Sequence, residues 1–499
     1  MIEGAAKIYT LLLAGVFIIF SSIVLFNPED IRGVESNVIF SIQQILKDNK
    51  GLYQDPANAP YSVTQYSPLY YVLIDSALSI YDFDIGREFY EIRIVARTVS
   101  LLLSLTLVYL LYTLLVKEYY TDKQFSLSLC LLFLIVTYPW FHLSRPDVLV
   151  TLFLLLAINQ TVKFLKTGEL KYVVIGGCIC AFAFFSKQNG IIILLGIAAF
   201  FIVSGKIKVT LFFSAGFIAG ILSCSVVFFL LDYHSNFLFD NIVRGVNNGV
   251  SLENFHLKFL NNSISLYGFL IISSIVVSAA TFNALKKDVV YQFLLFLSVT
   301  VLTFSIITAL KQGSAEHYLL DWFTISLIMF GYVTTKIKSS GVRKLAIALS
   351  TWVVLIYSTS VMMLHVYRYH KDFVAASEMI AGIILPGEKE SAENGIIAFL
   401  EAEIGEDYFY SPERSLRLRF PFNALFPQDE VVFGEQGLFA KKVFSYASLH
   451  KHVQSGQFKY YIDKEGIPPS FFGASLEDDF VFLIKIGALN VYKNKNNKF

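Results

Sequence analysis

Long apolar segments separated by short polar ones fill the first three quarters of the chain. A helix that crosses the hydrocarbon core needs about 17–25 mostly apolar residues, because backbone groups in lipid must bond to one another. On this basis we predict eleven transmembrane helices, at about residues 8–26, 95–116, 125–141, 148–165, 172–186, 190–204, 209–231, 265–285, 290–310, 317–335 and 345–364.

The apolar stretch 67–81 is treated differently because it has only fifteen residues and is interrupted by Asp75. We predict a helix that lies in the membrane interface. With this assignment the amino terminus is cytoplasmic, the cytoplasmic segments carry 14 Lys and Arg residues and the short outer loops carry 5. This asymmetry is what the positive-inside rule requires. We therefore expect a multi-pass integral membrane protein whose long polar segments are extracytoplasmic.

Composition supports a membrane protein and excludes other classes. The 499 residues are 55% hydrophobic and only 16% charged, with a mean hydropathy of +0.59. The formal net charge of +1 provides no basic surface for nucleic acid, so we expect no nucleic-acid partner. Every cysteine lies in an apolar run and is interpreted as a packing residue rather than a disulfide or zinc ligand: Cys130, Cys178, Cys180 and Cys224.

Two domains are predicted. Residues 1–364 form an all-α transmembrane module with a long first outer loop at 27–94, and residues 365–499 form a small extracytoplasmic α/β domain. The tail has mixed charge, a helix at Gly395–Ile404 that Asn394 could cap, and β-rich runs at Val431–Phe433 and Phe480–Ile486. A structural lid and a role in acceptor recognition are equally compatible with this pattern.

The first outer loop supplies candidate carboxylates. It opens with Glu29, Asp30, Arg32 and Glu35, and continues into an amphipathic helix at Ser36–Asp48. Placing a charged side chain at membrane depth costs free energy, so charged residues next to membrane spans are functional candidates by default. Glu35 is therefore a functional candidate, together with Asp30 and Glu29. The competing interpretation of Glu35 is a helix-start carboxylate stabilised by the helix dipole.

Other outer segments supply cations and a further carboxylate. The second loop, His142–Asp147, is short and contains Arg145 and Asp147, while Arg97 and Lys187 lie at the outer ends of other predicted spans. Arg145 and Asp147 could equally form a local ion pair, and Arg97 and Lys187 could extend to the headgroups. We favour a cationic pocket in which Arg97, Lys187 and Arg145 bind a phosphate.

The remaining candidates are an interfacial tyrosine and a final polar loop. Ser67 and Pro68 begin a helix that contains Tyr70, and the last outer loop contains Lys311, Glu316, His317 and Asp321. We assign Tyr70 and His317 to acceptor contacts, although a histidine at such an interface is more often structural than catalytic.

These features together resemble the GT-C superfamily of polyprenyl-phosphate-dependent glycosyltransferases, especially protein O-mannosyltransferases and lipid A aminoarabinose transferases. The resemblance covers roughly residues 8–320. It rests on the acidic residue, helix and Gly51-Leu52-Tyr53 order, on Ser67 to Tyr71, on Arg97 with Ser100, on Asp147, and on the loop Lys187 to Gly190. The chain departs from the family where Val34-Glu35 replaces Asp-Glu.

The resemblance implies transfer of a sugar from a polyprenyl-phosphate donor to a glycan, lipid or protein acceptor outside the cytoplasm. It further implies an inverting displacement in which a carboxylate accepts the acceptor's proton. Glu35 is the expected base, with Asp30 or Glu29 as alternatives. Asp147 would orient the acceptor, or bind a divalent metal if one is used; the sequence requires no cofactor. The alternatives are a transporter or flippase for lipid-linked sugars and a polysaccharide polymerase or ligase.

Overall fold

The computed structural model describes residues 2–27, 30–31, 35–46, 51–80, 89–231, 233, 236–246, 249–311, 313–337, 340–382, 394–428, 447–467 and 476–497. A helix forms in each of the eleven segments predicted to span the membrane: α1 (Ile2–Leu25), α4 (Phe89–Thr113), α5 (Lys123–Phe141), α6 (Asp147–Thr167), α7 (Leu170–Ser186), α8 (Ile191–Val203), α9 (Ile207–Leu230), α11 (Asn261–Leu285), α12 (Val289–Ala309), α13 (Leu320–Thr335) and α14 (Ser340–Arg368).

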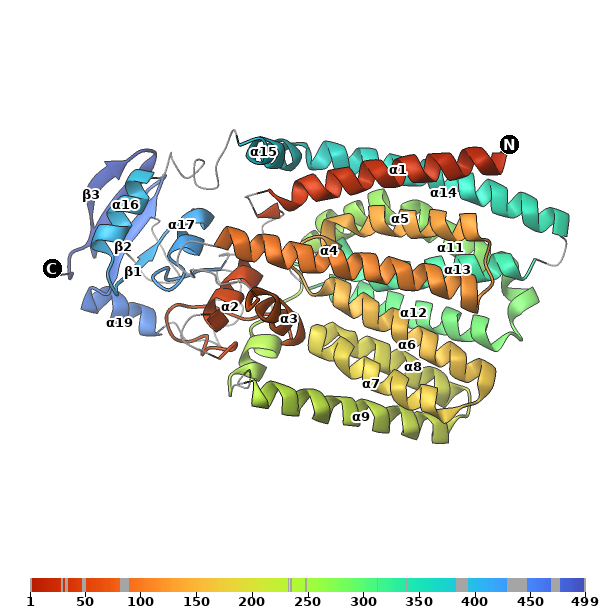
Figure 1. The fold of residues 1–499 in the computed structure, drawn as a ribbon. Helices are drawn as coiled ribbons and strands as arrows, with labels where there is room; N and C mark the ends of the chain where they lie inside the picture. The colour runs from red at the N-terminus through yellow and green to blue at the C-terminus, as the bar shows by residue number, and fades with distance from the viewer. Residues whose placement is uncertain are drawn as a thin grey trace.

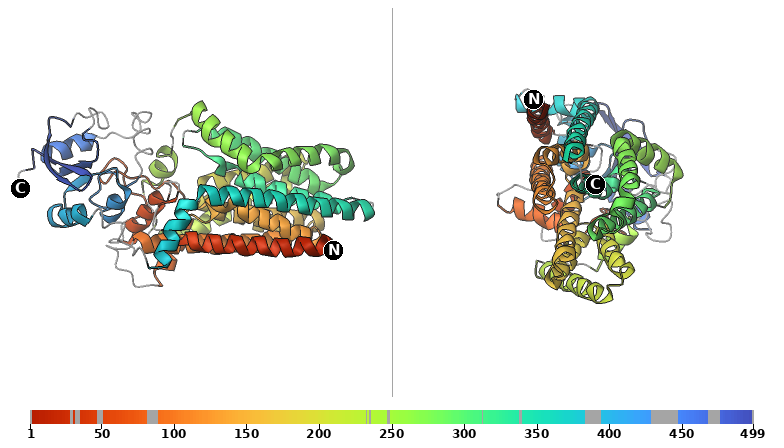
Figure 2. Two further views of the ribbon diagram at one scale, coloured as in Figure 1. Left: turned by 90° about the horizontal axis from the view of Figure 1, so that it is seen from above. Right: turned by 90° about the vertical axis from the view of Figure 1, so that its right-hand side faces the viewer.

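These helices run side by side in one bundle, with the amino terminus at one end and the carboxyl-terminal sheet beyond the other (Figure 1). The left view of Figure 2 shows the same separation, and the right view looks along the bundle. Eight helices of the described part are long and apolar enough to cross a membrane, whereas α7 and α8 are shorter. The polytopic helical fold is confirmed. The count of eleven spans and the orientation in the bilayer stay predictions.

Short helices and turns connect the bundle at both ends. They are η2 (Leu114–Glu118), η3 (Gln188–Gly190), η4 (Asp240–Arg244), α10 (Leu252–Asn254), η5 (Phe255–Leu260) and η6 (Glu316–Leu319). The first loop contains two more, α2 (Ser36–Leu46) and α3 (Leu69–Leu78), where the sequence predicts an amphipathic and an interfacial helix.

Helix α2 is covered on its polar face as well as its apolar one. Residues 36–44 are all buried. The amides of Gln43 and Gln44 are accommodated because they donate hydrogen bonds to the Leu418 carbonyl and the Ser62 hydroxyl. Buried amides need such partners. The sequence pattern locates this helix, but it does not reveal that polar groups of the first loop and of the tail cover it.

The tail contains a four-stranded sheet in the order β1-β2-β4-β3, formed by β1 (Tyr408–Tyr410), β2 (Phe458–Asp463), β3 (Phe480–Ile486) and β4 (Leu489–Asn494). The β1-β2 pair is parallel and the other two pairs are antiparallel. The helices of this region are α15 (His370–Ile380), α16 (Asn394–Glu403), α17 (Arg414–Arg419) and α19 (Ala447–Ser455).

The predicted helix at 395–404 and the predicted strand at 480–486 are therefore confirmed as α16 and β3. The predicted strand Val431–Phe433 lies outside the described residues. Because α14 continues to Arg368, the exact domain division at 364/365 stays a prediction.

The tail packs directly on the first loop. The Tyr61 and Val63 amides donate to the Leu425 carbonyl and the Gln428 Oε1 at 2.9 and 2.8 Å. Tyr61 and Val63 also share an apolar core with Phe426 of the tail. The first loop thus lies between the transmembrane bundle and the sheet.

Candidate active site

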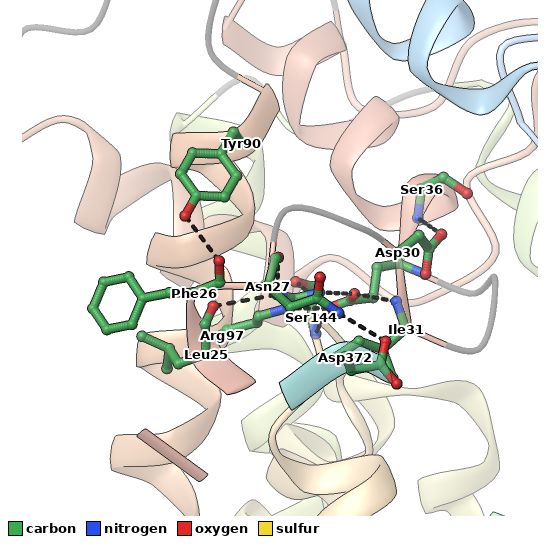
Figure 3. A network of polar contacts seen from close by, with 11 residues as sticks. Leu25, Phe26, Asn27, Asp30, Ile31, Ser36, Tyr90, Arg97, Ser144 and Asp372 are labelled. Carbon is green, nitrogen blue, oxygen red and sulfur yellow. Dashed lines mark hydrogen bonds and ion pairs between the residues drawn. The ribbon is translucent and has the colours of Figure 1, made fainter. Parts of the chain in front are cut away.

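Glu35 and Arg97 form a buried ion pair at the loop end of the bundle. Figure 3 shows Arg97, Ser144 and Ile31, which belong to the same network. Arg97 Nε lies 2.9 Å from Glu35 Oε1 and its terminal nitrogen lies 2.5 Å from Oε2. The Ser144 amide and hydroxyl donate to Oε1 at 3.1 Å, and the Ile31 amide donates to Oε2 at 3.1 Å. The Glu35 side chain is 0% exposed, so its oxygens are fully occupied by protein donors.

The pKa values of Glu35 and Asp30, two carboxyl groups of the first loop, shift in opposite directions. Burial by itself would raise the pKa of Glu35, but the guanidinium of Arg97 outweighs it and lowers that pKa to about 2. Burial and the negative charge of Glu35 raise the pKa of Asp30 above its ordinary value. Asp30 accepts hydrogen bonds from the Glu35 and Ser36 amides, and so caps α2.

Helix α4 begins at Phe89, six residues before the predicted span. The earlier start places Arg93 and Arg97 on one buried face, where each is only 1% exposed. Arg97 also donates to the Leu25 and Asn27 carbonyls. Arg93 was missed by the sequence analysis, although the four-residue spacing of the two arginines was a signal that they share a face.

A second ion-pair cluster surrounds Asp147 at the start of α6. Lys187 Nζ lies 2.8 Å from Oδ1 and Arg145 Nε lies 3.0 Å from Oδ2. Burial lowers the pKa of Lys187, but Asp147 outweighs this effect, so that the pKa lies above its ordinary value. The rings of Tyr66 and Trp140 lie 5.7 and 4.9 Å from the Arg145 guanidinium.

The second loop joins the two clusters, because Ser144 contacts Glu35 while Arg145 contacts Asp147. Glu35 and Lys187 therefore lie at the same end of the bundle and are connected through four consecutive residues, 144–147. This convergence is the geometry that the sequence predicts. The alternative of a local Arg145–Asp147 ion pair is also present, since both contacts involve the same carboxylate.

The last loop adds two groups that keep partial exposure. Asp321, in the first turn of α13, accepts a hydrogen bond of 2.7 Å from the Thr151 hydroxyl, one turn below Asp147 on α6. Lys311 has no ion-pair partner among the described residues. Burial and repulsion from Lys187 lower the pKa of Lys311 to about 8. The sequence places Lys311 and Asp321 in the last outer loop, but it does not predict a role for either residue.

The other candidates lie around these clusters. Tyr70 is buried, and its hydroxyl contacts the Ser100 hydroxyl at 2.8 Å. His317 is 8% exposed and its ring lies 4.5 Å from that of Trp140. Glu29 and Arg32 lie outside the described residues.

A small cavity lies beside the Glu35–Arg97 pair, lined by Arg97, Tyr138, His142 and apolar residues of α1. Within the described ranges, no group of three or more His, Cys, Asp or Glu side chains is arranged to hold a metal ion. Both oxygens of Asp147, the expected metal ligand, contact cationic side chains.

Comparison with known proteins agrees with this architecture. Residues 89–230 match the family described as dolichyl-phosphate-mannose-protein mannosyltransferase. The structure is similar to that of ArnT from Cupriavidus metallidurans bound to undecaprenyl phosphate, with a TM-score of 0.58, 11% identity and 97% of both chains covered. The chain has a GT-C-like fold.

A second solved structure shows the same fold. The archaeal oligosaccharyltransferase AglB from Archaeoglobus fulgidus, in complex with an inhibitory peptide and a dolichol-phosphate, matches with a TM-score of 0.51 and 12% identity, over 91% of this chain and 69% of that chain. No curated protein matches the sequence.

Proposed function

We propose that this protein is a GT-C glycosyltransferase, which transfers a sugar from a polyprenyl-phosphate donor to an acceptor hydroxyl with inversion at the anomeric carbon. The observation that carries the proposal is the convergence of Asp147, Lys187, Lys311 and Asp321 at one end of the bundle. Such a site offers cations for a phosphate and carboxylates for a proton. The fold likeness to ArnT bound to undecaprenyl phosphate supports a lipid-linked donor.

The cations would act on the leaving group. Negative charge builds on the lipid phosphate as its bond to the sugar breaks, and fixed positive groups stabilise that charge most in the transition state. Lys187 and Arg145 remain proposed phosphate ligands, but each already pairs with Asp147. Lys311 is added because its amine has no such competitor among the described residues, and a phosphate would satisfy it.

Arg97 has a different position. Its guanidinium donates hydrogen bonds to Glu35 and to the carbonyls of Leu25 and Asn27. In this arrangement Arg97 and Glu35 would fix the first loop and the second loop relative to each other. A direct role of Arg97 with phosphate, of Glu35 or Asp30 as the base, and of Tyr70 or His317 with the acceptor stays a prediction.

The test is a donor-cleavage assay with the purified protein in sealed proteoliposomes. A panel of radiolabelled polyprenyl-phosphate sugars is added together with a cell-envelope extract as the acceptor source, and release of free polyprenyl phosphate is measured. Transfer requires that labelled sugar leaves the lipid. Movement of intact donor across a bilayer without cleavage would contradict the proposal and support a flippase.

A further inference from the structure

We infer that Asp321 is the carboxylate that accepts the proton of the acceptor hydroxyl, an inference that rests on the proposed transferase function. The carboxylates at this end of the bundle differ in how their oxygens are occupied. A general base needs a lone pair within hydrogen-bond reach of the hydroxyl that it deprotonates. The described carboxylates of the site can be compared on that criterion.

Glu35 has no oxygen lone pair available to an acceptor hydroxyl in this structure. Its two oxygens accept five hydrogen bonds from Arg97, Ser144 and Ile31, and the side chain is 0% exposed. Such a carboxylate is a weak base, because protonation would break contacts with a buried guanidinium. An approaching hydroxyl would also have to displace protein donors.

Asp147 and Asp30 are occupied as well. Each oxygen of Asp147 contacts a cation, Lys187 or Arg145, and the side chain is 6% exposed. Each oxygen of Asp30 accepts a backbone amide at the start of α2. Removing either set of contacts would leave buried donors unsatisfied.

Asp321 differs in each of these respects. Its Oδ1 accepts one hydrogen bond, from the Thr151 hydroxyl, and its Oδ2 has no hydrogen-bond partner among the described residues. It forms no ion pair with any residue that the structure describes and it keeps partial exposure. Its carboxylate lies within reach of the charges of Asp147 and Lys187, which places it next to the proposed phosphate-binding cations.

The proposed step is balanced without a further reactant. The acceptor oxygen forms a bond to the anomeric carbon, the bond from that carbon to the phosphate oxygen breaks, and its electron pair stays on the lipid phosphate. The acceptor proton moves to Asp321 Oδ2 and is later released to water. Thr151 holds the other oxygen, so that Oδ2 keeps a fixed direction.

Azide tests this assignment because the azide anion attacks carbon without losing a proton. The donor is the labelled polyprenyl-phosphate sugar that the wild type cleaves in the assay above. We expect Asp321→Asn to slow transfer to hydroxyl acceptors by about 10²–10⁴-fold. With sodium azide as the acceptor, the Asp321→Asn variant should react within a few-fold of the wild-type rate. Its affinity for the donor should equal that of the wild type.

Two further variants keep the test decisive. Asp321→Glu retains the charge and should fold; a slower hydroxyl reaction with a normal azide reaction would support the inference. Asp240→Asn removes a carboxylate from a surface ion pair with Arg244 and should match the wild type in both reactions. Equal loss of both reactions in Asp321→Glu, or full hydroxyl activity in Asp321→Asn, would overturn the role of Asp321. A wild type that cleaves no donor would instead overturn the proposed function.

Discussion

At the scale of single residues, Arg97 donates to both oxygens of Glu35 and to two carbonyls at the end of α1. One side chain therefore ties α1, α2 and α4 together. Removing one partner of a buried ion pair is costly because the other charge is left without compensation.

Arg97→Met should destabilise the protein by about 3–5 kcal/mol for this reason. Glu35→Gln should also lower the thermal unfolding midpoint, measured by tryptophan fluorescence in detergent. The double variant should lose less than the sum of the two single variants, since both partners are then neutral. Additive losses would show that the pair is not a stabilising unit.

The pKa of Glu35 predicts a pH dependence of stability. Its folded value of about 2 is below the ordinary value of 4.5. The stabilisation from this group is therefore fully present above about pH 4.5 and is lost as the pH falls toward 2. We expect the difference in unfolding midpoint between the wild type and Glu35→Gln to shrink over that window; a constant difference would contradict the ion-pair origin.

Lys311 predicts a pH dependence of donor binding. Its pKa of about 8 means that the amine becomes neutral as the pH rises through 8 and then attracts phosphate less. The apparent donor affinity of the wild type should fall between about pH 7 and 9. In Lys311→Arg it should stay constant, because arginine remains charged. Lys311→Met should bind weakly at every pH, as measured by equilibrium binding of labelled donor.

At the scale of secondary-structure elements, α7 and α9 approach each other through glycines. A Cβ at Gly177 would lie 2.1 Å from the Phe213 carbonyl oxygen, and one at Gly216 would lie 2.2 Å from that of Val174. Gly216 and Gly220 have the four-residue spacing that lets membrane helices pack closely. This contact matters for the site because Lys187 directly follows α7.

Gly177→Ala should force α7 and α9 apart, lower the unfolding midpoint and reduce donor cleavage. Gly15→Ala on α1 is the matched control, because a Cβ there meets no atom within 4 Å. The two purified variants are compared by thermal unfolding and by release of polyprenyl phosphate. Equal behaviour of Gly177→Ala and Gly15→Ala would contradict the role of the close contact.

The elements also show what sequence could predict. Helix positions follow from long apolar runs, and loop parity places Glu35, Asp147 and Lys187 at one end. The individual partners could not be predicted, because Asp321 meets Thr151 across 170 residues of chain and Glu35 meets Arg97 across 62. The start of α4 was not predicted because Arg93 is charged, yet Arg93 is buried near the carboxylates of Glu35 and Asp30 rather than exposed to lipid.

At the scale of the whole molecule, the tail and the transmembrane bundle meet through the first loop. Sequence located both parts but could not predict their contact, which depends on backbone bonds such as that from Tyr61 to Leu425. Tyr61 is fully buried, and Leu425 and Phe426 are 0% exposed.

Leu425→Glu should therefore detach the tail from residues 59–64, because it places a charge in this apolar contact. We expect faster cleavage of the first loop by added protease and slower donor cleavage. Val481→Glu, at a position 50% exposed on β3, is the control and should leave both unchanged. Unaltered protease resistance in Leu425→Glu would show that the first loop keeps its conformation without this contact.

Tyr61 and Tyr66 belong to one short segment of the first loop, which contacts the tail at one end and the candidate site at the other. The Tyr61 hydroxyl is hydrogen-bonded to the Ser448 hydroxyl of the tail. The ring of Tyr66 lies 5.7 Å from the Arg145 guanidinium and 5.2 Å from the Lys187 amine. A shift of the outer domain by a few ångströms would be transmitted along five residues to the aromatic cover of both cations. Binding of a bulky polymer to the outer surface of the sheet domain would in this way shift the Tyr66 ring relative to Arg145 and Lys187, the proposed phosphate ligands.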